Sequence, residues 1–414
     1  MLFLSLYILC FPPLSFAYAL IGLIKSPLKW KKYIPFLVYA LFIGAYVFEP
    51  PPRNYINDLD LAVYLPMIED FGKLSLIEAF QKYNDGLYAR DFIFWFFGTI
   101  QAPHMIPAIT TSTVYAVAFY ITCDTAARYN SERYIPIIVL FQISMLPYFT
   151  IVNNVRNVFS LALVVLAVYL DLVRKKSFLF VFFCYIFGCL MHLSTAVLIV
   201  FRVFCLPLKN CFELVFVLPV IFKPLVDIIY STNIFSFLGG ELGNRVHQIL
   251  SRLHQYMNND FAAYSIISVN SITVKFDRTV MVIGMTIALV LISYGLRSVK
   301  RIFNDNEKFY VFIGLIAIMS ILLGITMPMP NFWRFAAAFY TAFGMLIIPF
   351  ILHYKELPAL LRLLVPVYAV IGFLSFIMQI WKCTWFDFGN WMLSFFTANM
   401  FTVLYDLING MLEL

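Results

Sequence analysis

The chain has 414 residues, of which 62% are hydrophobic, 18% are aromatic and only 12% are charged, and its formal net charge at pH 7 is +7. Soluble globular domains contain about 25% charged residues, so this composition excludes an ordinary soluble enzyme or binding domain. In a membrane protein an excess of Lys and Arg mainly sets the orientation of the helices, so the positive charge does not indicate a nucleic-acid partner.

Apolar runs of membrane-spanning length recur along the whole chain, and no hydrophilic stretch is long enough for a separate soluble domain. Runs of about 20 apolar residues are typical of helices that cross a bilayer. We therefore predict an all-α, polytopic membrane protein with one integral domain over residues 1–414 and 12–13 transmembrane helices. The predicted crossings are 3–24, 33–48, 104–123, 135–152, 156–173, 177–191, 193–207, 212–230, 279–297, 308–327, 333–352 and 361–380, with 391–408 as the candidate thirteenth.

The loops on the two sides of the predicted membrane differ in length and charge. One set is short and holds most of the Lys and Arg residues, as in Arg174, Lys175 and Lys176. The positive-inside rule places this set in the cytoplasm. The opposite side has two long loops, 49–103 and 231–278. Membrane insertion does not explain the basic residues of these outer loops, which are therefore candidates for function.

The first long loop begins and ends with paired charges. Asp58 and Asp60 form a D-x-D triplet shortly after Arg53. Two carboxylates beside an arginine can place a general base next to an anion site, although a solvated or helix-capping pair explains such a triplet equally well. At the end of the loop, Arg90 and Asp91 precede an apolar run too short to span, for which we predict an in-plane or re-entrant helix. Arg90 is either a phosphate ligand or simply the partner of Asp91.

Two arginines are predicted to lie in the first turn of a helix at the outer surface. Arg156 lies in the sequence VNNVRNV, where Asn153 and Asn154 are the predicted N-caps, and Arg334 repeats the arrangement after another asparagine. A helix N-terminus carries partial positive charge and free N–H groups, so an added guanidinium makes an anion site suited to phosphate. The alternative is an arginine that only extends its side chain to the membrane surface.

His192 lies between two short apolar segments, 177–191 and 193–207, which predict a helical hairpin with His192 at its outer turn. There the imidazole could accept a proton or bind a sugar hydroxyl. The alternative is a histidine that is only hydrogen-bonded, to Ser194 or Thr195.

The second long loop has the apolar spacing of an amphipathic helix, flanked by Arg245 and Arg252 one heptad apart. Such a helix would lie on the outer leaflet, where it either docks on the membrane or binds a glycan or head group. The spacing of His247 and His254 is poor for a metal, so we predict no zinc and no cofactor; a divalent ion at the D-x-D triplet is left open.

Three stretches share features with one known family. They are an arginine-led helix, basic loop and histidine-bearing hairpin (NNVRNVFSLALVVLAVYLDLVRKKSFLFVFFCYIFGCLMHLSTAVLI), an acidic-aromatic first outer loop (DLDLAVYL) and a late arginine-containing helix start (NFWRFAAAFY). In these features the chain resembles the EpsG/Wzy-type polysaccharide (O-antigen) polymerase family. That family usually has a glycine-rich turn before its first-loop acids, where this chain has RNYINDLD.

The resemblance implies a glycosyltransferase of the bacterial inner (cytoplasmic) membrane, with a helical fold similar to the lipid-carrier (GT-C) class and an active site that faces the periplasm. Such an enzyme polymerises O-antigen or capsule repeat units. Its donor and acceptor are oligosaccharides linked to undecaprenyl diphosphate, and a chain-length regulator protein is a further expected partner.

This chemistry assigns roles to the outer charged residues. Diphosphate is a good leaving group that needs charge stabilisation, and its predicted ligands, in order of preference, are Arg156, Arg334, Arg53 and Arg90. The candidate catalytic bases for the acceptor hydroxyl are Asp60, Asp58 and His192. The weaker candidates for glycan contact are Arg245, Arg252, Asn153 and Asn157. No metal is needed if arginines neutralise the diphosphate.

Three other functions fit the same sequence less well. One is a membrane acyltransferase, which should show a histidine with nearby acids facing an acyl tunnel. An O-antigen ligase would use the same donor with lipid A-core as the acceptor. A transporter or flippase of lipid-linked saccharides should carry charges along the membrane midplane, where only Lys223 is a clear mid-helix cation.

Overall fold

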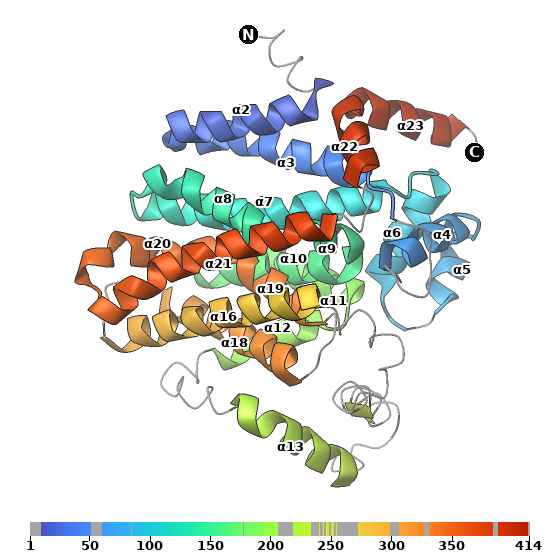
Figure 1. Ribbon diagram of the computed structural model, residues 1–414. Coiled ribbons are helices and arrows are strands. Elements are labelled where there is room, and N and C mark those ends of the chain that lie inside the picture. Colours follow the sequence, from blue (N-terminus) through green and yellow to red (C-terminus); the bar gives the residue numbers. More distant parts are fainter. Residues whose placement is uncertain are drawn as a thin grey trace. The chain divides into compact units, whose positions relative to one another are not determined.

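The computed structural model describes residues 10–50, 60–83, 85–176, 178–205, 218–232, 272–298, 306–326, 331–383 and 388–412, with scattered positions between 240 and 254. Every regular element in these residues is a helix (Figure 1). The all-α prediction is therefore confirmed.

The chain forms two compact units. The first consists of Met1–Val203 and Ala337–Leu414, and the second consists of Phe204–Ala336. The α-helices that lie in the first unit are α2 (Pro12–Lys25), α3 (Trp30–Tyr46), α4 (Asp60–Gly72), α5 (Leu76–Gln81), α6 (Tyr88–Thr99), α7 (Met105–Arg128), α8 (Ile135–Met145), α9 (Tyr148–Asn153), α10 (Val155–Leu172), α11 (Phe178–Met191), α20 (Phe343–Leu352), α21 (Ala359–Cys383), α22 (Phe388–Thr397) and α23 (Met400–Leu412). The α-helices that begin in the second unit are α13 (Leu218–Thr232), α16 (Ile272–Ser298), α18 (Glu307–Thr326) and α19 (Asn331–Thr341), while α12 (Thr195–Phe204) and α19 each extend across a boundary between the units.

Four helices in the described part of the chain are long and apolar enough to cross a membrane: α7, α10, and the segments Arg278–Arg297 of α16 and Glu307–Gly324 of α18. The bent pairs α19–α20 and α22–α23 raise the number to six if each pair is one span. A polytopic membrane protein is thus confirmed, with four to six candidate spans where 12–13 were predicted. The other apolar helices of at least ten residues are Pro12–Lys25, Phe178–Met191, Thr195–Phe204 and Ala359–Ser375.

Two of the predicted crossings are interrupted in the structure, one between α8 and α9 and the other between α22 and α23. The crossing at 135–152 divides into α8 and α9 because Pro147 has no N–H to continue the hydrogen-bond ladder and forces Leu146 into an extended conformation. The segment 391–408 bends by 89° between α22 and α23, which is the geometry of a broken span or a re-entrant loop.

Within the first unit, α7 is the central helix. It contacts α3 on one side and α10 on another, and also packs against α20, α8 and α9 (Figure 1). Many buried side chains of α7 are small or carry a hydroxyl group, so neighbouring helices can approach it closely. For example, Thr122 on α7 donates a hydrogen bond to Gln142 on α8 at 2.7 Å.

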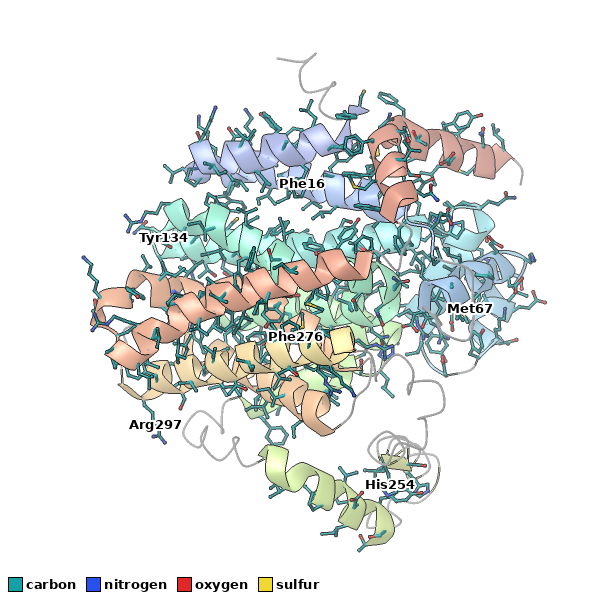
Figure 2. All side chains as sticks on the ribbon, viewed as in Figure 1. Phe16, Met67, Tyr134, His254, Phe276 and Arg297 are labelled. Atoms are coloured by element: carbon teal, nitrogen blue, oxygen red, sulfur yellow. The ribbon has the colours of Figure 1, made fainter. Side chains whose placement is uncertain are left out.

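The short helices α4, α5 and α6 form a separate group at one end of this unit. Figure 2 shows Met67 of α4 at this end and Tyr134, in the short 3-10 turn Glu132–Tyr134, at the other. The α4–α6 pair is held by two glycines: a Cβ on Gly98 would lie 2.0 Å from the carbonyl oxygen of Ile68, and one on Gly72 would lie 2.2 Å from the Gly98 backbone. This close approach brings the side chains of α4 and α6 into one cluster.

The second unit is built on α16 and α18, which pack along each other, with α13 also in contact with α18. Close packing of α16 and α18 is aided by Gly324, whose missing side chain leaves room for Val282 and Phe332.

Candidate functional site

The start of α10 carries Arg156 as predicted, and one of the two predicted N-cap residues is at the N-cap position. This residue is Asn154, which makes no side-chain capping bond, whereas Asn153 is the last residue of α9. Both amides bond back into α9: Asn153 Nδ2 donates to the Phe149 carbonyl at 2.8 Å, and Asn154 Nδ2 donates to the Thr150 carbonyl at 2.9 Å. The predicted position is therefore confirmed for Asn154 and wrong for Asn153, and the capping bond is not formed because asparagine side chains can also satisfy carbonyls one turn back.

The guanidinium of Arg156 lies on the face of Tyr64 from α4. Its Cζ atom is 4.5 Å from the ring centre, and Nη2 donates a hydrogen bond to the Tyr64 hydroxyl. Tyr64 is only 6% exposed and packs against Phe94 of α6, with ring centroids 5.8 Å apart. Arg156 Nε is buried and has no hydrogen-bond partner in the described part of the chain. A partly buried guanidinium with an unused donor is a favourable place for an anion.

Arg90, at the start of α6, is in contrast fully engaged with carboxylates. Nη1 and Nη2 donate to the two oxygens of Asp85 at 2.8 and 3.0 Å, and Nε donates to Asp91 Oδ1 at 2.8 Å. Arg90 is 4% exposed and Asp91 is 1% exposed, whereas the Asp85 side chain is 40% exposed. The alternative in which Arg90 pairs with Asp91 is therefore the arrangement that the structure shows.

The two carboxyls respond differently to this environment. Burial raises the pKa of Asp91 above its ordinary value, and the hydrogen bonds and charge of Arg90 offset this only in part. Burial also acts on Asp85, but there the hydrogen bonds and charge of Arg90 outweigh it and lower the pKa. The charge of Arg156 favours the ionised form of both carboxyls, which places Arg156, Arg90 and the two aspartates in one electrostatic cluster.

Two predicted catalytic residues lie at the same end of the first unit. Asp60 is the first residue of α4 and precedes Tyr64 by one turn, so the two side chains share a face of the helix. His192 follows α11 at the predicted turn, and its Nδ1 atom lies 2.7 Å from Ser194 Oγ. This is the contact expected if the histidine is only hydrogen-bonded. The end of α11 is near the start of α10, because Met191 shares a small apolar cluster with residues of α6 and α10.

The other predicted site residues are less constrained. Arg334 is in the first turn of α19, as predicted, and is half-buried; it belongs to the second unit, and its sharing a cleft with Arg156 stays a prediction. Asn153 and Asn157 are both buried, and Asn153 Oδ1 has no hydrogen-bond partner among the described residues. The predicted residues that lie outside the described part of the chain are Arg53, Asp58, Arg245 and Arg252.

Sequence reasoning did not assign a role to Tyr64 or to Asp85. Tyr64 stands in the DLDLAVYL stretch one helical turn after Asp60, and Asp85 stands five residues before Arg90. These spacings were visible, but the contact of Tyr64 with Arg156 joins residues 92 positions apart. Within the described residues, no group of three or more His, Cys, Asp and Glu side chains could hold a metal ion.

Comparison with known proteins gives one family match. The sequence model of the EpsG family matches residues 53–390, a range that includes every predicted site residue. Neither the curated proteins nor the solved structures contain a significant match to this chain.

Proposed function

Because the chain belongs to the EpsG family, we propose that it polymerises polysaccharide repeat units at the outer face of the bacterial inner membrane. Membership of the family implies a role in exopolysaccharide biosynthesis. The proposal adds the reaction: transfer of a glycan from undecaprenyl diphosphate to a second lipid-linked repeat unit.

The observation that carries the proposal is the state of Arg156. This cation is partly buried on Tyr64, at the start of a candidate membrane span, and has no carboxylate at ion-pair distance in the described part of the chain. A buried charge without a counter-ion is costly unless a ligand supplies one. A diphosphate head group would do so, and a guanidinium binds it through paired hydrogen bonds.

In the proposed reaction, the acceptor hydroxyl attacks the anomeric carbon of the donor sugar. The bond from this carbon to the diphosphate oxygen breaks, and its electron pair leaves with the diphosphate. Arg156 stabilises the charge that develops on the leaving group, with Arg334 and Arg53 as further predicted ligands. Arg90 is better suited to hold Asp85 and Asp91 in place, because its donors already bind these carboxylates.

The proton of the acceptor hydroxyl must go to a base. Asp60 is the favoured candidate because it lies on α4 one turn before Tyr64, the residue that Arg156 contacts. Asp58 and His192 are the other two candidates.

The test is complementation of a strain that lacks this chain, with gel analysis of the surface polysaccharide. We expect Arg156→Ala and Arg334→Ala to leave only single repeat units at matched expression. Arg133→Ala is the matched control, because Arg133 also lies over a tyrosine ring, that of Tyr134 at 4.7 Å, but is exposed at the opposite end of the first unit.

The products distinguish the alternatives. Loss of all attached glycan, with lipid-linked polymer still formed, would indicate a ligase. Repeat units trapped on the cytoplasmic side would indicate a transporter. Full-length polymer from Arg156→Ala and Arg334→Ala would remove the basis of the proposed site.

A further inference from the structure

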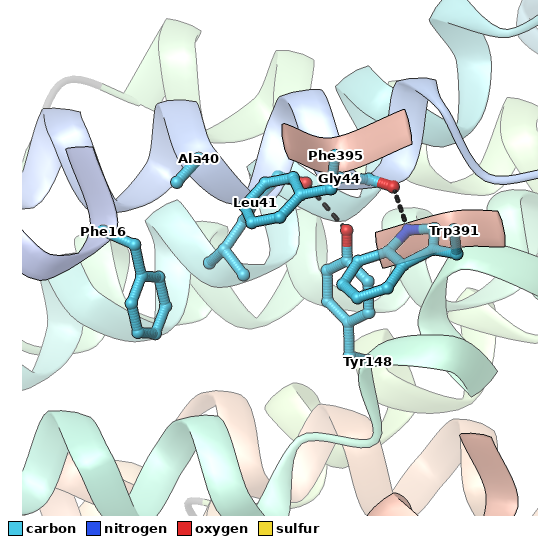
Figure 3. A pocket seen from close by; sticks show the side chains of 7 residues that line it. All are labelled: Phe16, Ala40, Leu41, Gly44, Tyr148, Trp391 and Phe395. Atoms are coloured by element: carbon cyan, nitrogen blue, oxygen red, sulfur yellow. Dashed lines mark hydrogen bonds between the residues drawn. The ribbon is translucent and has the colours of Figure 1, made fainter. Parts of the chain in front are cut away.

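An apolar cavity of about 200 Å³ lies within the first unit (Figure 3). It is bordered by helices α2, α3, α9 and α22, and none of the described residues that line it is charged. The lining residues are Phe16, Ala40, Leu41, Gly44, Tyr148, Trp391 and Phe395.

The polar atoms of the two amphipathic rings in the wall are bound to the backbone of α3. The Tyr148 hydroxyl donates to the Leu41 carbonyl at 3.0 Å, and Trp391 Nε1 donates to the Gly44 carbonyl at 2.7 Å (Figure 3). The rings therefore present their apolar faces to the cavity. A cavity of this kind selects hydrocarbon, since a polar ligand would lose its hydrogen bonds to water without replacement.

The wall of the cavity is closely packed. A Cβ atom on Gly44 would lie 2.6 Å from the Tyr148 hydroxyl, so the absence of a side chain there permits the contact between α9 and α3. Trp391 stacks on Phe395, with ring centroids 5.4 Å apart and an interplanar angle of 3°. The wall of the cavity is therefore built from aromatic rings that pack on each other and on α3.

The cavity lies close to Arg156 along the chain and in space. Tyr148 begins α9, a helix of six residues or about 9 Å, and Arg156 lies in the first turn of the next helix, α10. Phe149, beside Tyr148, packs against Trp391 with ring centroids 5.4 Å apart. Phe149 and Tyr64 belong to the same core cluster, so the cavity and the ring that carries Arg156 border one packed core.

We propose that this cavity holds the first part of the polyprenyl tail of the lipid diphosphate whose head binds Arg156. The proposal rests on the proposed function and names the tail subsite of that same site. The occupant follows from the combination of a cation that requires an anion and, about one short helix away, a cavity with an apolar wall. At about 200 Å³ the cavity is smaller than the 300–1,000 Å³ of a typical ligand pocket, so it holds a segment of the tail while the rest lies in the bilayer.

The experiment uses the full-length protein in nanodiscs and a long-chain polyprenyl diphosphate with a photoreactive group near the head end of its tail. We expect crosslinks to peptides of α9 and α22. Excess unlabelled polyprenyl diphosphate should prevent them, and excess phosphatidylglycerol should not. Ala40→Phe, which fills the cavity, should abolish the crosslinks and weaken binding of the long-chain ligand about tenfold, equivalent to about 1.4 kcal/mol.

Two controls separate the cavity from the head-group site. Ala369→Phe introduces the same ring at a smaller apolar cavity of about 90 Å³ between α8, α20 and α21 and should change neither crosslinking nor affinity. Inorganic diphosphate has a head and no tail, so its binding should be unchanged by Ala40→Phe and lost in Arg156→Ala. If Ala40→Phe does not fold, Phe16→Trp narrows the cavity from its half-buried edge and should reduce crosslinking in the same direction.

Two results would overturn the tail subsite. One is crosslinking to other helices while diphosphate binding still depends on Arg156; the proposed function would then stand without the cavity. The other is equal displacement by phosphatidylglycerol, which would make the cavity a site for bulk lipid. If no diphosphate binding depends on Arg156, the proposed function itself fails.

Discussion

The two ends of the α7–α10 helix pair differ in whether a buried charged side chain has a partner of opposite charge. At one end the Asp124 carboxyl is matched, because Tyr169 donates a hydrogen bond to it and Arg174 Nη2 lies 3.4 Å from its Oδ1 atom. At the other end Arg156 is partly buried on Tyr64 with no carboxylate at ion-pair distance in the described residues. Both charges lie on the same pair of parallel helices, Asp124 near the carboxyl ends and Arg156 at the amino end of α10.

The difference separates a structural ion pair from a ligand site. A charge with a built-in partner stabilises one arrangement of helices, whereas an unmatched cation costs free energy until a ligand arrives. Another cation of the same cluster as Arg156 does have carboxylate partners, because Arg90 binds both Asp85 and Asp91. We therefore expect changes at the matched pairs to affect stability and changes at Arg156 to affect catalysis.

The largest effect on stability is expected for Arg90→Ala. This change leaves Asp91, which is 1% exposed, without its cation, and removal of one partner from a buried pair typically costs about 3–5 kcal/mol. Thermal unfolding of the purified protein in detergent should show a clear fall in Tm. Lys73→Ala is the control, because the Lys73–Asp70 pair is exposed on both sides and should leave Tm unchanged. An unchanged Tm for Arg90→Ala would mean that the cluster does not brace α6.

Arg156→Lys and Arg174→Lys should give opposite results. Lysine keeps the charge but loses the planar fork that binds phosphate, so Arg156→Lys should lower polymerisation at least about tenfold, or about 1.4 kcal/mol, with little change in Tm. Arg174→Lys should leave polymerisation intact, because its partner Asp124 requires only a cation. Both are measured by polymer yield and Tm on matched preparations. Equal losses of polymerisation activity in the two variants would contradict the view that Arg156 binds a ligand while Arg174 forms a structural ion pair.

The sequence was informative wherever a property is local. Apolar runs predicted the helices, and the position of Arg156 at a helix start followed from the residues next to it. Pro147 was a local signal as well, and it explains the break between α8 and α9 that the predicted crossing ignored. The short α6 helix after Arg90 was likewise predicted by the brevity of its apolar run.

The rest of the site depends on tertiary packing. Gly72 and Gly98 let α4, which carries Tyr64, pack against α6 at backbone contact, and neither glycine indicates in the sequence that Tyr64 meets Arg156. Each asparagine side chain before Arg156 could bond either a free N–H group at the start of α10 or a carbonyl one turn back. In the structure both donate to carbonyls of α9. The sequence therefore predicted that Arg156 is the cation of the site, but not that Tyr64 contacts it.

Tyr64→Phe should have a smaller effect than any change at Arg156. Phenylalanine keeps the aromatic face under the guanidinium and removes the hydroxyl that accepts its hydrogen bond. Loss of one such bond costs about 1 kcal/mol, so we expect activity to fall about fivefold. Tyr134→Phe, which changes the ring under the exposed Arg133, should have no effect. If Tyr64→Leu is no worse than Tyr64→Phe, the ring does not hold Arg156.

The smallest expected effect is a change in the acid limb of stability in Asp85→Asn. Arg90 lowers the pKa of Asp85 in the folded protein, so the ionised carboxylate contributes stability above its ordinary pKa, and this contribution is lost as the pH falls through the lowered value. In the parent protein this contribution to Tm should therefore be complete above the usual aspartate pKa of about 3.9 and should be lost as the pH falls below that value. Asp85→Asn should lack this loss of Tm.

Asp91 gives the test of sign. Burial raises its pKa, so its contribution runs the other way: stability falls as the pH rises from the ordinary value through the raised one. Asp91→Asn should therefore make the acid-side loss of Tm steeper, and Asp85→Asn should make it shallower. If both variants shift the pH profile of Tm in the same direction, the pKa values of Asp85 and Asp91 are not shifted in opposite directions. Arg90 would then not hold these two carboxylates in the way described here.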